Sequence, residues 1–310
     1  MVSVIFGSNS YGRKHALDLA VSDFLKKAPD TEVRHIQATD VDSAELRQAL
    51  QSTGLFSQSV CIVLHDASKN KQLTEAFESV LDAVDKDSLL VVVEQNLDKR
   101  TSFSKLLTKQ GDVTECSEQD EHSLRNWVLA EVKRRGGSIS SADAGLLLSK
   151  LGTNQWSLST EIDKLLIHSS SITKESIELL VEPSAQEKIF ALTDAVSYGN
   201  TQRASAILDN LFQQQLEARY VMSMLGWQIH NMVIMAGASG DSAYLKEMKI
   251  NPFVARKTSD VVRRISRRTL ADLVGIVIEG DRLSKSSAAD NNEIVSHTVY
   301  KLCQAVKRST

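Results

Sequence analysis

The amino-acid sequence predicts an α/β domain with a parallel sheet, followed by a region built only from helices. Over the first 118 residues, short apolar segments alternate with segments in which apolar residues recur at helical spacing. Strands that alternate with helices favour a parallel sheet with right-handed crossovers. After residue 118 the helical spacing continues without a convincing strand pattern. We therefore expect two architectures in one chain.

The elements of the α/β part follow from its apolar runs. The Leu89–Val93 run is apolar throughout, which is typical of a strand covered on both faces. The other expected strands lie at 2–6, 32–37, 61–64 and 113–116. Helices are expected between them at 16–25, 43–52, 73–84 and 102–110.

The helical part divides at Pro183, because proline cannot continue a helix. Before it, four helices suggest a small domain. After it, helices are expected at 187–198, 202–214, 216–237, 252–265, 268–285 and 292–307. The predicted domains are 1–118, 119–186 and 187–310.

Composition excludes several classes of protein. A net charge of −3 over 310 residues does not indicate a nucleic-acid binder in bulk. Cys61, Cys116 and Cys303 show no CxxC spacing, so neither a disulfide framework nor a zinc site is expected. No apolar run approaches the roughly 20 residues that cross a membrane. A reducing cytoplasm is the expected location.

The loop after the first strand resembles a phosphate-binding loop, GxxxxGK[ST]. Gly7 and Gly12 have the required separation, but Arg13 stands at the lysine position and Lys14 at the Ser/Thr position. An ammonium group cannot ligate Mg²⁺. The loop is therefore interpreted as a tight strand-to-helix turn. Weak nucleotide binding and ATP hydrolysis by an active P-loop enzyme are the alternatives.

Hydrolysis would also need an acidic group at the end of a strand, to hold Mg²⁺ and orient water. The candidates are Asp66, after His65, and Glu94. Neither is a clean match. We expect no catalytic residue, no metal and no cofactor.

Leu55 and Phe56 are large apolar residues in the polar stretch from Gln51 to Gln58. Gly54, just before them, is expected to end the preceding helix. The pair either anchors the loop under the edge of the sheet or fills a pocket on a partner, with Gln51 adding a directional hydrogen bond.

A second candidate contact surface is a basic stretch near residue 260, opposed only by Asp260. It would contact DNA phosphates, form a solvated helix face, or contact a neighbouring subunit. Its members are Arg256, Lys257, Arg263, Arg264, Arg267 and Arg268.

Several segments together resemble the delta subunit of the bacterial DNA polymerase III clamp loader, from Val4 to about Leu302. The resemblance is weakest in the C-terminal third. The matching segments are Phe6-Gly7-x-x-x-Tyr11, Ala49-Leu50-Gln51-x-x-x-Leu55-Phe56, Val91-Val92-Val93-Glu94 with Leu97-Asp98-Lys99-Arg100, Gly152-x-Asn154 with Leu158-x-x-Glu161-Ile162-x-Lys164-Leu165, and Ser184-Ala185-x-Glu187-x-Ile189-Phe190-x-Leu192-x-Asp194-Ala195-Val196.

This resemblance implies an AAA+-like first domain, a helical lid and a helical collar through which subunits assemble. Such subunits do not hydrolyse ATP; they bind the sliding clamp and open one interface of the ring. Leu55 and Phe56 would enter a hydrophobic pocket of the clamp, with Gln51 beside them. The implied partners are the clamp, the ATPase motor subunits, a delta-prime-like subunit and primed DNA, within a nucleotidyltransferase holoenzyme. Direct DNA binding through the basic stretch is the alternative.

Overall fold

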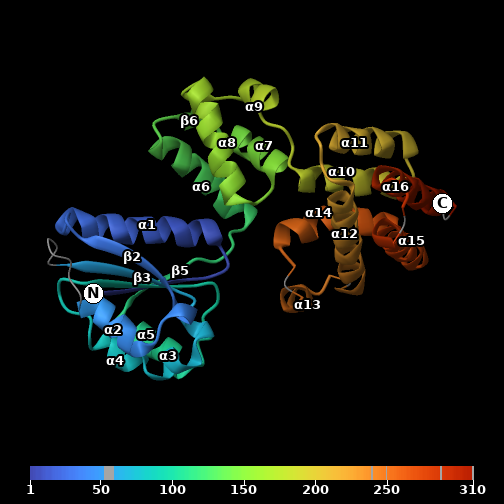
Figure 1. Cartoon of the computed structure of the whole chain (residues 1–310). Helices are drawn as coiled ribbons and strands as arrows, with labels where there is room; N and C mark the ends of the chain where they lie inside the picture. The colour runs from blue at the N-terminus through green and yellow to red at the C-terminus, as the bar shows by residue number, and fades with distance from the viewer. Residues whose placement is uncertain (52–58, 239, 249, 287, 309–310) are drawn as a thin grey trace. The chain divides into compact units, whose positions relative to one another are not determined.

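The computed structural model describes residues 1–51, 59–238, 240–248, 250–286 and 288–308 (Figure 1). The chain divides into two compact units, Met1–Gln119 and Asp120–Thr310. The first is an α/β unit and the second is mostly helical, as predicted. None of the described helices is long and apolar enough to span a membrane.

The first unit is built on a five-stranded parallel sheet in the order β2-β3-β4-β1-β5. Its strands are β1 Val2–Phe6, β2 Glu32–Gln37, β3 Val60–His65, β4 Leu89–Glu94 and β5 Asp112–Glu115. Its helices are α1 Ser10–Lys27, α2 Ser43–Gln51, α3 Lys71–Glu75, α4 Phe77–Leu81 and α5 Ser102–Gln110, with 3₁₀ turns η1 Ala38–Asp40 and η2 Ala67–Lys69.

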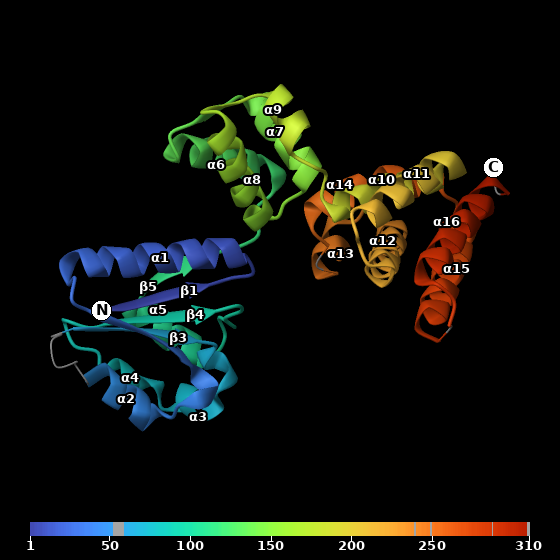
Figure 2. The ribbon, with the colours of Figure 1, turned by 45° about the horizontal axis from the view of Figure 1, so that its top comes forward.

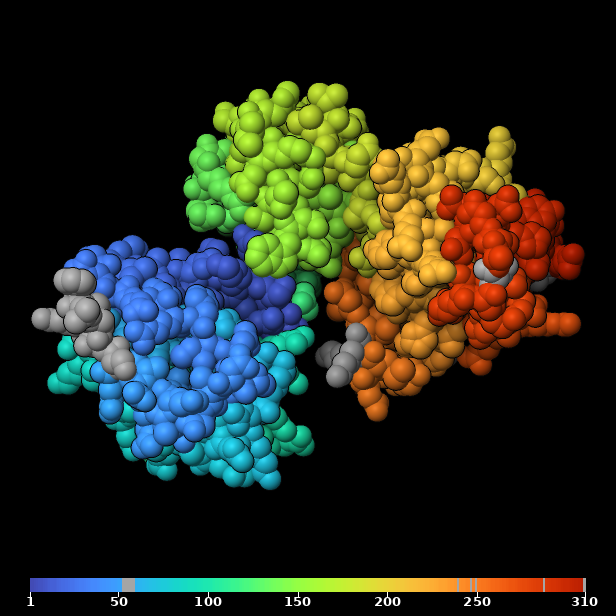
Figure 3. All heavy atoms as spheres, in the orientation of Figure 1, coloured from blue at the N-terminus to red at the C-terminus, as the bar shows by residue number. Residues whose placement is uncertain are grey.

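Side chains alternate in direction along the central strands, and helices cover both faces of the sheet. Cys61 and Val63 of β3 pack with Leu17 and Phe24 of α1. Ile62 and its like-facing neighbours pack with α2, α4 and α5. Figure 2 shows α1 on one side of the sheet and α2 to α4 on the other. Figure 3 shows the same unit with all heavy atoms drawn as spheres.

The second unit contains two large hydrophobic cores and a small cluster of Phe190, Phe253 and Val254. The first lies among α6 Glu121–Arg134, α7 Ser141–Leu151, α8 Gln155–His168 and α9 Lys174–Leu180. The second lies among α10 Ala185–Ser197, α11 Thr201–Gln213, α12 Ala218–Ala238, α14 Pro252–Arg264, α15 Arg267–Ser286 and α16 Asn291–Lys307. Helix α12 contacts α10, α14, α15 and α16.

Three details differ from the sequence-based expectation. The helix expected at 73–84 is two short helices, because Ala76 (φ −97°, ψ 6°) ends α3 and lets Phe77 pack edge-on against Phe103. A two-stranded parallel sheet, β6 Ser138–Ile139 with β7 Ser171–Ile172, lies in the stretch expected to be helical. Helix α13 Ser242–Glu247 was not expected. Each added element is too short to show a period.

Candidate functional site

The phosphate-loop position connects β1 to α1 by only three residues, Gly7–Asn9. Helix α1 begins at Ser10, so Gly12 lies inside its first turn. A phosphate-binding loop instead keeps the residues between its two glycines outside the helix, so that their N–H groups can surround the phosphates. The helix thus begins too early to leave an open cradle.

Two of the three backbone N–H groups of this connection, those of Gly7 and Asn9, have acceptors within the chain. The N–H of Gly7 donates to the carbonyl of Glu94 at 3.3 Å, and that of Asn9 to the carbonyl of Cys116 at 3.0 Å. The side chain of Asn9 caps α1 by accepting from the N–H of Gly12 at 2.9 Å. These two N–H groups, which a phosphate-binding loop would direct at its ligand, are therefore used in hydrogen bonds within the protein.

Glycine is required at position 7 by the backbone conformation and by a close contact, and not by phosphate binding. Its φ of +136° is a conformation that side-chain-bearing residues rarely adopt, and a Cβ there would lie 2.0 Å from the carbonyl oxygen of Cys116. The segment after β5 thus lies directly on the loop. Nothing in the sequence marked Cys116 as the neighbour, although Asn9 before a helix is a recognisable capping signal.

The two cations of the loop bond locally. Arg13 Nη1 donates to the carbonyl of Gly7. Lys14 pairs with Asp18, one turn further along α1. Neither side chain is directed at an open site by these contacts.

The two candidate acids do not form a metal site with their neighbours. Asp66 pairs with Lys69 at 2.8 Å. Glu94 is buried and accepts hydrogen bonds from Ser68, from its N–H at 2.9 Å and its hydroxyl at 2.7 Å. Burial raises the pKa of the Glu94 carboxyl, and the bonds from Ser68 oppose that rise. Within the described ranges, no group of three His, Cys, Asp or Glu residues could hold a metal ion.

The apolar pair Leu55 and Phe56 lies outside the described residues. Gln51, the third predicted contact residue, is the exposed last residue of α2. The elements on either side are well anchored, because Leu50 of α2 and Val60 of β3 are both buried in the core of the sheet. The described elements that precede and follow the pair in the sequence, α2 and β3, are thus both held in the core of this unit.

Most of the basic stretch bonds to carboxylates of the second unit. Arg264 bonds to Asp194 at 2.5 Å and to the hydroxyl of Tyr198 at 2.8 Å. Arg263 pairs with Asp260 at 3.4 Å, and Arg267 donates to the carbonyl of Ala236 at 3.5 Å. Arg268 is exposed. The residues of the basic stretch thus lie on α14 and at the start of α15, and most of them form intramolecular ion pairs.

The most buried pair of this group was not anticipated from the sequence. Lys257 pairs with Glu187, and its Nζ lies 5.0 Å from the ring centre of Phe253. Arg256 next to it pairs with Glu121 at the start of α6. Burial raises the pKa of Glu187, and Lys257 opposes that rise. Only an indirect signal for these pairs was present in the sequence: Glu121 lies in the first turn of α6 and Glu187 in the first turn of α10.

Comparison with known proteins identifies two matching family models. The model described as DNA polymerase III, delta subunit matches residues 14–117, and the one described as DNA polymerase III delta subunit, C-terminal domain, matches residues 186–302. No similarity to an individually curated protein is significant.

Among solved structures, the DNA clamp loader delta protein of Bacillus subtilis has the same fold. It aligns with a TM-score of 0.76 and 17% identity, covering 98% of this chain and 95% of its own. Domain III of the Thermotoga maritima replication initiation protein DnaA aligns with 58% of this chain and 82% of its own, at 17% identity and a TM-score of 0.39. The Thermotoga maritima RuvB Holliday junction branch migration motor aligns with 63% and 68%, at 13% identity and 0.41. The TM-scores of the DnaA and RuvB alignments are too low to support an inference about this chain.

Proposed function

Because the chain belongs to the family of DNA polymerase III delta subunits, we propose that it binds the sliding clamp and opens the ring for loading onto primed DNA, without hydrolysing ATP itself. ATP would be used by the motor subunits of the same clamp loader. The parts 119–186 and 187–310 would serve as the lid and the collar of this subunit.

The clamp contact proposed is the segment that contains Leu55 and Phe56, with Gln51 beside it. Two large apolar side chains between polar neighbours suit a hydrophobic pocket on a partner, where each would contribute about 1.5–3 kcal/mol. The burial of Leu50 and Val60 supports this role, since it fixes α2 and β3, the described elements on either side of the pair in the sequence, in the core of the first unit. Opening then follows if the unit binds the open ring more tightly than the closed one.

The observation that supports the proposed absence of ATP hydrolysis is the short connection Gly7–Asn9 between β1 and α1. The N–H groups of Gly7 and Asn9 are bonded within the chain, and the position of the Mg²⁺ ligand is occupied by Lys14, which pairs with Asp18. An active P-loop ATPase would need those donors free. ATP binding to the purified chain, measured by calorimetry, separates the two functions: we expect no binding, and turnover of ATP would contradict the proposal.

Direct DNA binding through the basic stretch has less support. Lys257 and Arg264 are paired with Glu187 and Asp194, and such pairs leave little charge to neutralise phosphates. We propose that these residues mainly stabilise the collar. Salt-dependent gel shifts with primed DNA test this, since the isolated chain should bind only weakly.

The contact itself is tested with the variant Leu55→Ala/Phe56→Ala in surface plasmon resonance on immobilised sliding clamp. Loss of both anchors should weaken binding by about a hundredfold or more. Leu19→Ala is the control, because Leu19 is an apolar residue on α1 that is 51% exposed. Unchanged affinity of the double variant, with normal thermal unfolding, would overturn the proposed contact.

A further inference from the structure

Two neighbouring residues of α14, Arg256 and Lys257, bond to acids on two different helices. Arg256 pairs with Glu121 in the first turn of α6. Lys257 pairs with Glu187 in the first turn of α10. Consecutive residues of an α-helix project about 100° apart, so two neighbours can reach in different directions. One turn of α14 therefore contacts both parts of the second unit, α6–α9 and α10–α16.

The Lys257 pair is the more buried of the two. The side chain of Glu187 is 6% exposed, against 22% for Glu121. Lys257 Nζ also lies 5.0 Å from the ring centre of Phe253 and 5.7 Å from that of Phe190. The two rings belong to the small apolar cluster that joins α10 and α14. This pair therefore anchors α14 to α10.

The Glu187 carboxylate also lies against the end of α7. Gly152, which follows α7, has a φ of +77°, and a Cβ there would lie 3.6 Å from Glu187 Oε1. The N–H of Ser184, the residue before α10, donates to the carbonyl of Lys150 in α7 at 2.8 Å. The two parts of the unit thus meet where α7 ends and α10 begins, and Glu187 lies at this junction.

Glu121 and Glu187 bring like charges to one junction. Burial raises the pKa of Glu187, the pair with Lys257 opposes that rise, and the Glu121 carboxylate adds to it. Repulsion of this kind disfavours an arrangement that holds α6 and α10 together. Arg256 and Lys257 offset it, because each places a cation on one of the two carboxylates. Arg125, one turn along α6, also pairs with Glu121 at 3.5 Å.

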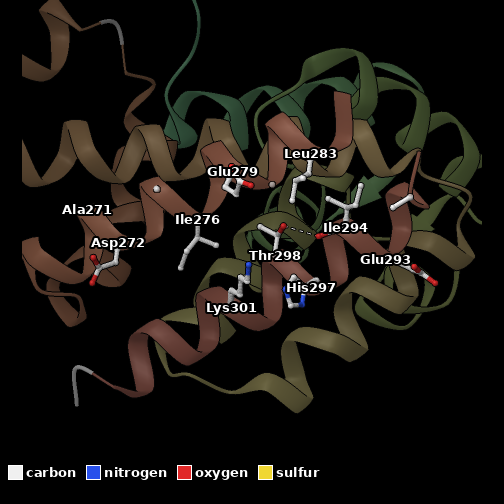
Figure 4. A pocket seen from close by; sticks show the side chains of 13 residues that line it. Ala271, Asp272, Ile276, Glu279, Leu283, Glu293, Ile294, His297, Thr298 and Lys301 are labelled. Carbon is white, nitrogen blue, oxygen red and sulfur yellow. Dashed lines mark hydrogen bonds between the residues drawn. The ribbon is translucent and has the colours of Figure 1, made fainter. Parts of the chain in front are cut away.

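The other acids beside α14 have partners of their own. Asp260 pairs with Arg263 in the same helix, and Asp194 of α10 pairs with Arg264. The groove between α15 and α16 is lined by acidic and basic side chains alike (Figure 4), so its charges favour no particular ligand. Among the ion pairs of the described residues, the one between Arg256 and Glu121 joins α14 to α6–α9.

We propose that these two ion pairs, Arg256–Glu121 and Lys257–Glu187, form a clasp that holds α6–α9 rigidly on α10–α16, and that Glu121 and Arg256 are positioning residues for opening of the clamp. This inference rests on the function proposed above. In the sequence, α6 follows the first unit directly, so a force on the clamp contact passes along the chain into α6–α9 before it reaches α10–α16. A stiff junction lets the subunit bind the open ring more tightly than the closed one, whereas a loose junction would bend and bind both alike.

The first test measures loading of fluorescent clamp onto primed circular DNA by the complete clamp loader, reconstituted from this chain and the other subunits. Glu121→Gln and Arg256→Gln each remove one charge and keep a side chain that suits a helix. Each should slow loading by roughly three- to tenfold, the range for a side chain that couples two sites. The double variant should be no slower than the slower single variant, because both changes break the same pair.

Two controls accompany this test. Arg263→Gln breaks an exposed pair within α14 and should load the clamp normally. The isolated Glu121→Gln and Arg256→Gln chains should bind immobilised clamp as the wild type does in surface plasmon resonance, since neither residue belongs to the proposed clamp contact.

The second test measures stiffness by double electron–electron resonance between spin labels at Leu179→Cys on α9 and Ser205→Cys on α11. Both positions are exposed, and the half-buried Cys116 is replaced by Ser so that it takes no label. We expect a narrow distance distribution in the wild type and in the control variant. The distribution should broaden in both clasp variants.

Several outcomes would overturn the inference. Normal loading by both clasp variants would do so and leave the proposed function standing. If only Arg256→Gln slows loading, the arginine acts on DNA or on another subunit and not through Glu121. Slow loading with an unchanged distance distribution, or additive losses in the double variant, would also show that the pair is no clasp. If the wild-type chain does not bind the clamp, the proposed function itself is wrong.

Discussion

At the scale of single residues, the loop between β1 and α1 depends on Gly7 far more than on Gly12. Gly7 has a positive φ and lies against the backbone of Cys116, whereas Gly12 lies in a helical turn beside the Asn9 side chain. A phosphate-binding loop would need both glycines for its ligand. In this chain the requirement at Gly7 is structural.

Gly7→Ala should therefore lower the free energy of unfolding of the first unit by about 2–4 kcal/mol, through backbone strain and the clash with Cys116. Gly12→Ala should cost clearly less, since alanine suits a helix and its Cβ would need only a small shift of the Asn9 side chain, whose Cγ would lie 3.2 Å away. Urea unfolding followed by circular dichroism measures both. Equal losses at the two positions would contradict this account of the loop.

The paired cation Lys257 differs from its exposed neighbour in the same helix. Lys257→Ala leaves the buried Glu187 carboxylate without its ion pair and should cost about 2–4 kcal/mol. Arg263→Ala breaks an exposed pair with Asp260 and should cost less than about 1 kcal/mol. Thermal unfolding of the two variants compares them, and a similar melting temperature for both would show that the Glu187 pair is not stabilising.

At the scale of elements, the apolar pattern predicts the sheet well and the short elements poorly. The central strands are recognisable because a run such as Leu89–Val93 is buried on both faces. The break at Ala76 accompanies a tertiary contact, Phe77 against Phe103, which no local pattern encodes. Strands β6 and β7 have only two residues each, which is too few to show alternation.

Helix α6 ends in a charge cluster that makes stability depend on pH. Glu131 is buried and accepts hydrogen bonds from Arg134 and Arg135. Bonding to Arg134, with Arg135 adding to it, lowers the pKa of Glu131 from 4.5 to about 2. Because the pKa is lower in the folded state, the stabilisation is present above 4.5 and is lost as pH falls toward about 2.

Glu131→Gln should thus be less stable than the wild type by about 2–3 kcal/mol at pH 7. The difference should be smaller at pH 3.5, where part of the wild-type advantage is gone. Denaturant unfolding at the two pH values measures it. A stability difference between the wild type and Glu131→Gln that grows on acidification would contradict this account of the Glu131 cluster.

At the scale of the whole molecule, the sequence predicted a parallel α/β part, a helical remainder and the family, and the structure and the comparisons confirm these. The two boundaries between the three predicted domains and the contact role of Leu55 and Phe56 stay predictions. The pairing of the basic stretch could not be foreseen, because Glu187 and Asp194 approach Lys257 and Arg264 only through the packing of α10 against α14.

The central claim is that this chain opens a ring without using ATP, and release of a clamp from circular DNA tests it most directly. Fluorescent sliding clamp is loaded on a nicked circular plasmid, and the purified chain is added without ATP. The account predicts that the clamp is released faster than it falls off alone, and that the Leu55→Ala/Phe56→Ala variant has no effect. Release that requires ATP, or none at all with the wild-type chain, would contradict it.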